Sequence, residues 1–536
     1  MNTSSEQRPL MYKVAAVQFN PVQGDAAGNR RRMAKLLQEA AENGAMLTVF
    51  PEMASSGYVW NDREEISPFV ETIPGSTTEA LQAVAQKYRC YAAVGLPEVD
   101  AVSGAYYNSA VLIGPDGVAG KYRKTHLFAA DPRWAREGND GIPVFATEIG
   151  NIALLICMDA MYFEPARIAA LQQADIIAFP TNWVGAGNNE PSNTWRLRAK
   201  ENGVYWVASN RSDTERGARF TGGSAVIEPD GGVQHSLVSG EGIVYGTVRL
   251  DAAARQQLTS ARKPEAYQEL LLSPYLWKEG ETLPIGAPAP FEIIVFPLEK
   301  PEFTAGLPDR LHALLEETEG RLTTGNRLYV LPEIQVRDPA DSAQAERLLA
   351  EVQLLAIRYQ GYMALSIAEH TGAVRDISAY MIGPEQTVGR CRQVHRTVRE
   401  RTDDKPRLCT FELPFARVGL LTEHDAEYPE SYRVLAKQGA DIIAVSGTGM
   451  GSGGNWMKRI WAFENDAVIA YALPSEAAGS LLFLHRQLEM EGGPGSGDEP
   501  LIGRFDPDMT AAARSRPFMR RTKPHLYDRL VMKLID

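Results

Sequence analysis

The stretch Ile152-Ala-Leu-Leu-Ile-Cys157-Met158-Asp159 returns 266 residues later as Val418-Gly-Leu-Leu-Thr-Glu423-His424-Asp425. Both segments have an apolar run and a closing aspartate, but Glu423 stands where the first copy has Cys157. An internal repeat sets the architecture of a whole chain, so it is interpreted before any single motif. We therefore expect two copies of one domain, and only the first copy has a cysteine at this position.

Further matches in the same order support a duplication. They surround the repeated segment on both sides, so the similarity extends over whole domains rather than one motif. The matched landmarks are Pro51-Glu52 with Pro332-Glu333, Glu164 with Glu430, Arg167 with Arg433, 174–178 with 440–444, 252–255 with 511–514, and Lys263 to Tyr267 with Lys523 to Tyr527.

Length and composition agree with two domains. The chain has 536 residues, which is too long for a single hydrophobic core, and 44% of them are hydrophobic. A run of prolines, Pro284, Pro288 and Pro290, interrupts both helical and strand periodicity. We expect one domain at 10–268, a linker at 269–290 and a second domain at 291–530.

Charge and cysteine usage exclude several classes of function. The net charge of −12 argues against a nucleic-acid partner or a membrane partner, and the basic cluster at 390–401 is interpreted as a solvated face. No run of 18 apolar residues occurs, and the polar start 1–9 lacks the apolar core of a signal peptide. The four cysteines show neither metal-ligand nor disulfide spacing. We expect a cytoplasmic protein without a metal.

Short apolar runs alternate with amphipathic segments in the first copy. Such mixed strands covered by helices predict a layered α/β or α+β domain. The expected strands are 13–19, 47–50, 91–96, 109–113, 152–156, 176–179 and 204–209. The expected helices are 31–42, 79–88 and 164–173.

Three residues at strand ends of the first copy suggest nucleophilic catalysis. Cys157 ends an apolar run, and a thiol needs a base or positive surroundings to react near neutral pH. Glu52 would be a partly buried carboxylate suited to proton transfer, and Lys124 could stabilise an oxyanion. Each residue also has a plainer interpretation, as a small buried hydrophobe, a turn residue and a solvated cation respectively.

Taken together, these segments resemble the nitrilase superfamily of carbon–nitrogen hydrolases. The resemblance extends from Tyr12 to about Tyr267 and rests on motifs in the family's order. These are Phe-Pro51-Glu52 with Ser56-Gly57-Tyr58, Tyr122 to Leu127 with Lys124 and His126, Cys157-Met-Asp159 with Glu164 to Arg167, Asn182-Trp183, Glu201-Asn202 and Phe220 to Ser224.

The resemblance implies an α-β-β-α sandwich in each copy and a cofactor-free amidase mechanism in the first. Glu52 would be the general base, Cys157 the nucleophile, and Lys124 with the backbone N–H of Met158 the oxyanion site. Asp131 stands where many members carry a glutamate, so it would orient substrate or Lys124, or merely begin a turn before proline. The neighbouring residues expected to line the substrate pocket are Tyr58, Trp60, Tyr162, Phe163, Asn182 and Trp183.

Within this family, Cys157-Met158-Asp159 is typical of amidases and carbamoyl hydrolases, whereas nitrilases tend to carry Cys-Trp-Glu. The expected substrate is a small amide or N-carbamoyl compound, with a nitrile as the alternative. A non-catalytic ligand-binding or regulatory protein is the rival from another class.

The second copy keeps the base position but not the other two catalytic positions. Glu333 matches Glu52, whereas Gln393 stands at the lysine position and Glu423 at the cysteine position. Two facing carboxylates would raise a pKa instead of supplying a thiolate, although acid–base work by the pair stays an alternative. We expect a structural partner domain that forms an internal pseudo-dimer with the first, and a further homo-oligomer stays open.

Overall fold

The computed structural model divides the chain into two compact units, Met1–Ser260 and Ala261–Asp536. No helix in the described part of the chain is long and apolar enough to cross a membrane. The described residues are 11–185, 190–273, 289–299, 301–304, 306–336, 343–371, 374–396, 406–450, 454–477, 479–493, 497–506, 508–509 and 515–533.

The first unit contains two six-stranded sheets. In each sheet three central strands run parallel and the outer strands antiparallel. The first sheet has the order β14 (Gly242–Arg249), β1 (Met11–Gln18), β2 (Ala45–Val49), β3 (Tyr91–Val99), β4 (Tyr106–Gly114) and β5 (Gly117–Arg123). The second has the order β13 (Val233–Leu237), β12 (Ser224–Ile227), β9 (Tyr205–Ser209), β8 (Ile176–Pro180), β7 (Gly150–Leu154) and β6 (Val144–Thr147).

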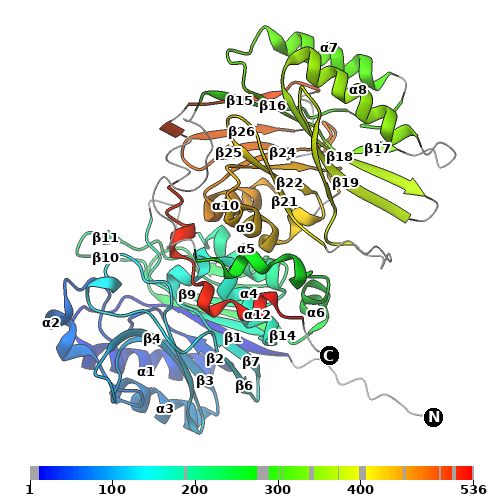
Figure 1. Cartoon of the computed structure of the whole chain (residues 1–536). Coiled ribbons are helices and arrows are strands. Elements are labelled where there is room, and N and C mark those ends of the chain that lie inside the picture. Colours follow the sequence, from blue (N-terminus) through cyan, green and yellow to red (C-terminus); the bar gives the residue numbers. More distant parts are fainter. Residues whose placement is uncertain are drawn as a thin grey trace, which may run out of the picture. The chain divides into compact units, whose positions relative to one another are not determined.

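The two sheets face each other, and helices cover their outer faces (Figure 1). Every residue of β8 is buried, as expected for a strand covered on both sides. Helices α1 (Ala26–Glu42) and α3 (Ser76–Tyr88) bury Met33, Leu37 and Leu81 against the first sheet. Helices α4 (Phe163–Leu171) and α5 (Asn193–Asn202) lie over the second. This arrangement confirms the predicted α-β-β-α sandwich.

The second unit repeats this topology with one added strand, β17, which confirms the duplication. Its first sheet has the order β20 (Thr387–Arg392), β19 (Val374–Ile382), β18 (Tyr362–Thr371), β16 (Arg327–Val330), β15 (Phe291–Val295) and β27 (Leu501–Phe505), with β17 (Ile334–Val336) paired to β18. Its second sheet has the order β21 (Cys409–Glu412), β22 (Arg417–Thr422), β23 (Ile442–Ser446), β24 (Val468–Ala472), β25 (Ser480–Leu484) and β26 (Leu488–Gly492).

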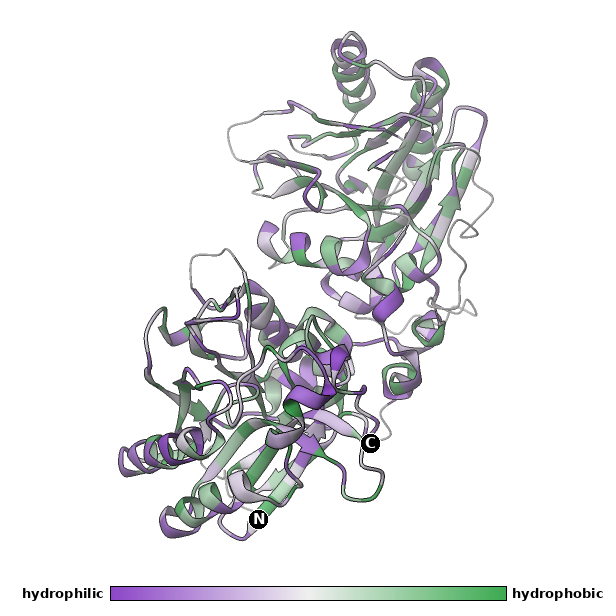
Figure 2. Cartoon of the chain, turned by 90° about the vertical axis from the view of Figure 1, so that its left-hand side faces the viewer, coloured by the Kyte–Doolittle hydropathy of each residue, from purple (hydrophilic) through white to green (hydrophobic). Residues whose placement is uncertain are grey.

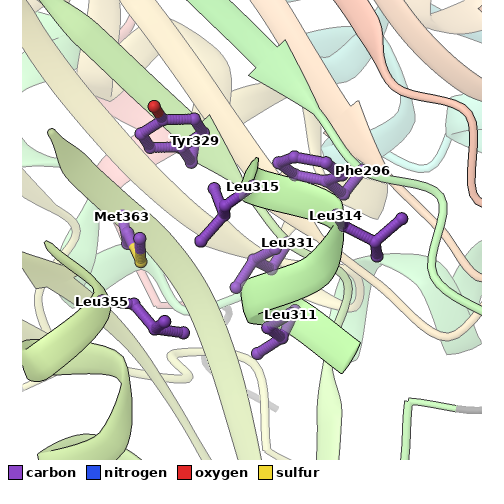
Figure 3. Close-up of a pocket in the computed structure, with 8 residues that line it drawn as sticks. All are labelled: Phe296, Leu311, Leu314, Leu315, Tyr329, Leu331, Leu355 and Met363. Carbon is purple, nitrogen blue, oxygen red and sulfur yellow. The ribbon is translucent and has the colours of Figure 1, made fainter. Parts of the chain in front are cut away.

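Helices cover the second unit's sheets as well. Helices α7 (Leu307–Glu319) and α8 (Gln344–Tyr359) pack on the first sheet, and α9 (Pro429–Lys437) and α10 (Asn455–Asn465) on the second. Between α7, α8 and the sheet lies an apolar cavity of about 10 Å³ (Figure 3). The side chains that line it are aliphatic or aromatic, apart from the thioether of Met363. Hydrophobic residues follow the strands of both units (Figure 2).

The boundary between the units precedes the predicted domain end at residue 268, because the segment after Ser260 packs with the second unit. Arg262 forms a buried ion pair with Glu430 at 2.6 Å and donates to the carbonyl oxygen of Leu530 at 2.6 Å. Tyr267 is hydrogen-bonded to His395. Of the predicted linker 269–290, residues 274–288 lie outside the described residues.

The repeated tails have the same local structure. The N–H of Lys263 donates to the hydroxyl of Tyr267 at 3.3 Å, and the N–H of Lys523 donates to the hydroxyl of Tyr527 at 2.9 Å. A short 3-10 helix lies inside each tail, η4 (Pro264–Ala266) and η9 (Pro524–Leu526). The matched residues 511–514 lie outside the described residues.

Candidate active site

Glu52 follows β2 and is completely buried. A glycine on the neighbouring strand allows this position, since a Cβ on Gly95 would lie only 2.5 Å from the Cα of Glu52. The Glu52 carboxylate accepts from Lys124 Nζ at 2.7 Å and from the N–H of Asn182 at 2.9 Å. Burial and the nearby charge of Asp131 raise the pKa of Glu52 despite the opposing effect of Lys124.

Lys124 follows the end of β5, and its ammonium lies between two carboxylates. Nζ is 2.7 Å from Oε1 of Glu52 and 2.6 Å from Oδ2 of Asp131, and all three side chains are buried. Burial alone would lower the pKa of Lys124, but the charges of Asp131 and Glu52 raise it well above its ordinary value. The lysine is therefore held as a cation at neutral pH.

Asp131 begins the 3-10 helix η2 (Asp131–Arg133) and contacts Lys124 rather than only shaping a turn. Its Oδ2 also accepts from the N–H of Phe128 at 3.0 Å, so it fixes the loop after Lys124. Asn108 on β4 joins the two acids, donating to Glu52 at 2.7 Å and to Asp131 at 3.0 Å. Sequence reasoning missed Asn108, although a buried asparagine within an apolar strand was a usable signal.

Cys157 is the first residue of the 3-10 helix η3 (Cys157–Met161), directly after the apolar run of β7. Its φ of 44° lies in the left-handed region, which a non-glycine residue adopts at an energetic cost. Burial raises the pKa of the Cys157 thiol, and the charge of Glu52 raises it further. The thiol is therefore protonated at rest and lies within the electrostatic reach of Glu52.

Asp159 ties the cysteine turn to the lysine segment. Its carboxylate accepts from the N–H of Ile156 at 2.9 Å and from the hydroxyl of Tyr122 at 2.8 Å. It also binds His126 through the backbone N–H at 3.1 Å and through Nδ1 at 2.9 Å. One buried carboxylate thus sets the position of Cys157 relative to the strand end that carries Lys124.

Three of the six residues predicted to line the pocket contact or adjoin the catalytic groups. The ring of Tyr58 has its centre 5.9 Å from Lys124 Nζ, and its hydroxyl donates to the carbonyl oxygen of Phe128 at 3.0 Å. Asn182 anchors Glu52, because its side chain donates to the backbone oxygen of Glu52 at 2.8 Å. Trp183 follows Asn182 and is half-buried.

The other three predicted lining residues make packing contacts in the structure. Trp60 stacks on Phe69 with ring centres 4.9 Å apart. Tyr162 stacks on His126 at 4.3 Å. Phe163 is buried at the start of α4. Met158, the expected backbone donor, is the second residue of η3, where the N–H groups of the first turn have no partner within the helix.

In the second unit, hydrogen bonds hold the matching side chains in a different arrangement. Glu423 accepts from the N–H of Thr448 at 2.7 Å and from the N–H of Gly449 at 3.2 Å. Gln393 donates to the carbonyl oxygen of His395 at 2.7 Å, and Glu333 accepts from the side chain of Gln335. The carboxylate at the cysteine position is therefore bound by backbone and hydroxyl donors, with no ammonium at the lysine position.

The supporting framework of the second site persists. Asp425 accepts from the N–H of His395 at 2.8 Å, as Asp159 does from His126, and His395 stacks on Tyr428 at 3.7 Å. Sequence reasoning missed one cation here, Lys458 on α10. Burial lowers the pKa of Lys458 to about 8, although the charge of Glu423 raises it.

Comparisons with known proteins identify relatives of this chain. The profile of the family described as carbon-nitrogen hydrolase matches residues 13–257 and 304–485. A nitrilase from Pyrococcus abyssi is 39% identical over 220 residues, which cover 41% of this chain and 82% of that protein. An omega-amidase from Homo sapiens is 30% identical over 271 residues, which cover 47% of this chain and 94% of that protein.

Among solved structures, an amidase from Nesterenkonia sp. has a TM-score of 0.40 at 24% identity, over 44% of this chain and 90% of that one. The matches to the nitrilase and the omega-amidase each cover less than half of this chain, the length of one copy, whereas the family profile matches two separate ranges. The chain therefore belongs to the carbon–nitrogen hydrolase family, the nitrilase superfamily, and contains two copies of its domain.

Proposed function

We propose that the first unit hydrolyses the carbon–nitrogen bond of a small amide or N-carbamoyl compound through a thioester on Cys157. The observation that carries this proposal is the buried cation Lys124 held between Glu52 and Asp131 beside the strained cysteine turn. A nucleophile, a base with a raised pKa and a fixed cation meet there in a site of low dielectric. Such preorganised charges stabilise a developing oxyanion far better than water does.

In the first step Glu52 takes the proton of Cys157 while Sγ attacks the carbonyl carbon. The proton has to move during the attack, because burial raises the pKa of the thiol and leaves little free thiolate beforehand. Lys124 and the N–H of Met158 then stabilise the negative oxygen of the tetrahedral intermediate. Asp131 supports this step by keeping Lys124 charged and fixed.

In the second step the protonated Glu52 gives its proton to the leaving nitrogen, and ammonia or an amine departs from the thioester. Glu52 then activates a water molecule, which releases the acid and restores the thiol. One carboxyl group thus serves alternately as base and acid, a role for which a raised pKa is suited.

An amide is favoured over a nitrile by the Cys157-Met158-Asp159 motif. The names of the relatives point both ways, since they include nitrilases and omega-amidases. The nitrilase reaction is therefore the second candidate. The two reactions can be distinguished by the preferred substrate, because a nitrilase would release ammonia from a nitrile in preference to a free amide.

For the second unit we propose a non-catalytic role as a structural partner of the first. Glu423 accepts from Thr448 and Gly449, and Gln393 donates to the carbonyl oxygen of His395, so neither matches the nucleophile or the cation of the first site. Acid–base catalysis by Glu333 and Glu423 would have to proceed without an ammonium at the lysine position.

The test is an ammonia-release assay across simple amides, N-carbamoyl amino acids and nitriles. The proposal expects release from an amide or carbamoyl compound and its loss in Cys157→Ala, while Cys90→Ala, a matched change at another buried cysteine, keeps full activity. Release that persists in Cys157→Ala would overturn the proposed nucleophile. Saturable ligand binding without any turnover across the panel would favour the non-catalytic rival.

A further inference from the structure

Two cysteines outside the candidate active site meet at adjoining edges of the second unit's sheets. Cys391 is on β20, the edge strand of one sheet, and Cys409 begins β21, the edge strand of the other. The two strands are in contact, and a Cβ on Gly389 would lie 2.1 Å from the ring of Phe411. The glycine therefore brings the two sheet edges together at the cysteines.

The two thiols share one acceptor. Sγ of Cys391 lies 3.4 Å and Sγ of Cys409 lies 3.6 Å from the carbonyl oxygen of Arg407. Each thiol also shifts the pKa of the other, as expected for neighbouring side chains. This geometry places the thiols close enough for one sulfur to attack a disulfide formed at the other.

The pair belongs to the second copy alone. The repeat aligns Cys391 with Tyr122 and Cys409 with Pro143 of the first unit, where Gly120 faces Phe145 as Gly389 faces Phe411. Tyr122 donates to Asp159 in the first unit and thereby supports the cysteine turn. The second copy has a small thiol at this place, so the pair is not a remnant of the first unit's active site.

Cys409 is open to small molecules, whereas Cys391 is shielded. Cys409 lines an open cavity of about 550 Å³ together with Arg407, Thr410 and Phe411. Cys391 is only 5% exposed. A reagent that enters the cavity therefore meets Cys409 first, and Cys391 stands behind it.

The charges around the pair favour the same order of reaction. The neighbouring thiol of Cys391 and the charge of Arg407 lower the pKa of Cys409. The neighbouring thiol of Cys409, together with burial, raises the pKa of Cys391 well above its ordinary value. The exposed sulfur is thus the better nucleophile, and the buried sulfur is suited to react second.

We propose that Cys391 and Cys409 form a redox-active dithiol that reacts with small-molecule disulfides entering the cavity beside Cys409. The Cys409 thiolate attacks one sulfur of the small disulfide, forms a mixed disulfide and expels the first thiolate. That thiolate takes the proton of Cys391, whose sulfur then attacks Sγ of Cys409 and expels the second group as a thiolate, which takes a proton from the solvent. Two protein thiols are oxidised to one disulfide, and one small disulfide is reduced to two thiols.

The test uses the reduced full-length chain and glutathione disulfide as the probe. The mixture is quenched with acid at intervals, free thiols are alkylated, and the peptides are mapped by mass spectrometry. We expect wild type to end with a Cys391–Cys409 disulfide and Cys391→Ser to accumulate glutathione on Cys409. Cys409→Ser should gain no disulfide at Cys391.

Cys90 provides an internal reference in the same sample, because it is buried and burial raises its pKa to about 11. Its thiolate fraction is therefore about a hundredfold lower than that of an ordinary thiol. A thiolate of lower pKa is also a weaker nucleophile, which reduces the expected rate difference by about tenfold. Cys409 should thus react about tenfold faster than Cys90.

Two results would overturn the proposal. One is a Cys409 that reacts no faster than Cys90, and this comparison needs only the wild-type chain. The other is a glutathione adduct on Cys409 that persists in wild type without conversion into the internal disulfide, because Cys391 would then not act as the second thiol.

Discussion

Replacing Glu52 by glutamine should lower the turnover rate and should also lower the pKa of the Cys157 thiol. The variant removes the base but keeps the shape of the side chain, so the reaction loses its proton acceptor. It also removes a negative charge that raises the pKa of Cys157, while the cation Lys124 stays beside the thiol. We therefore expect a slower enzyme with a more acidic thiol.

The contacts of Glu52 set the expected loss of rate and the expected loss of stability. Loss of a general base costs about 10²–10⁴ in rate, or roughly 3–5 kcal/mol of transition-state stabilisation. Among the described residues, Oε1 of Glu52 accepts from Lys124 and Asn108, whereas Oε2 accepts only from the N–H of Asn182. The new amide nitrogen should take the Oε2 position and face that N–H, which costs about 1–3 kcal/mol of unfolding free energy.

The assay compares Glu52→Gln with wild type in turnover, thermal unfolding and thiol titration. Thiolate is followed by ultraviolet absorbance, with matching Cys157→Ala variants subtracted to remove the other cysteines. We expect a pKa of Cys157 that is lower in Glu52→Gln. A rate loss below about tenfold would refute Glu52 as the base. An unchanged thiol pKa would refute the placement of its charge beside Cys157.

Three further predictions follow from the same geometry. Lys124→Met should lower kcat by about 10²–10³, the usual cost of losing an oxyanion donor, and should raise the pKa of Glu52 because the lowering effect of the cation is lost; kinetics across pH measures both. In wild type, kcat/KM should increase with pH as Glu52 ionises, and the midpoint of this increase should lie above pH 4.5. The reason is that the base acts when ionised and burial raises the pKa of Glu52 above 4.5. A midpoint at or below pH 4.5 would contradict this. Glu423→Gln should leave turnover within about twofold, because the amide oxygen can still accept from Thr448, whereas a loss of tenfold or more would mean that the second site takes part in the reaction.

Periodicity and repetition predicted the architecture because both are visible in the order of residues along the chain. The predicted strand 176–179 lies within β8, whose residues are all buried, and the predicted helix 31–42 lies within α1. Helix α5 escaped prediction because it buries Arg198 and Glu201 along with Trp195, so no polar face marks it. Arg198 and Glu201 form an ion pair and can therefore be buried, whereas the pattern of apolar spacing predicts that charged residues face the solvent.

The motif residues of the candidate site could be found in the sequence, but the residues that hold them in place could not. Asn108 reaches both acids only because β4 lies beside β3 and close to the loop after Lys124. The contacts of Asp159 likewise join segments that are far apart in the chain. Arg262 pairs with a glutamate 168 positions away, and this long-range ion pair assigns the first tail to the second unit. Such contacts depend on tertiary packing, which local spacing does not encode.

In the proposed mechanism, Cys157 alone carries the acyl group during turnover. Acid quenching during steady-state hydrolysis of an active amide, followed by peptide mapping, measures this directly. We predict one acyl adduct per chain, on the peptide that contains Cys157, and its absence in Cys157→Ala. An acyl group found on any residue of the second unit, or sustained turnover with no adduct on Cys157 under conditions that preserve thioesters, would contradict the account.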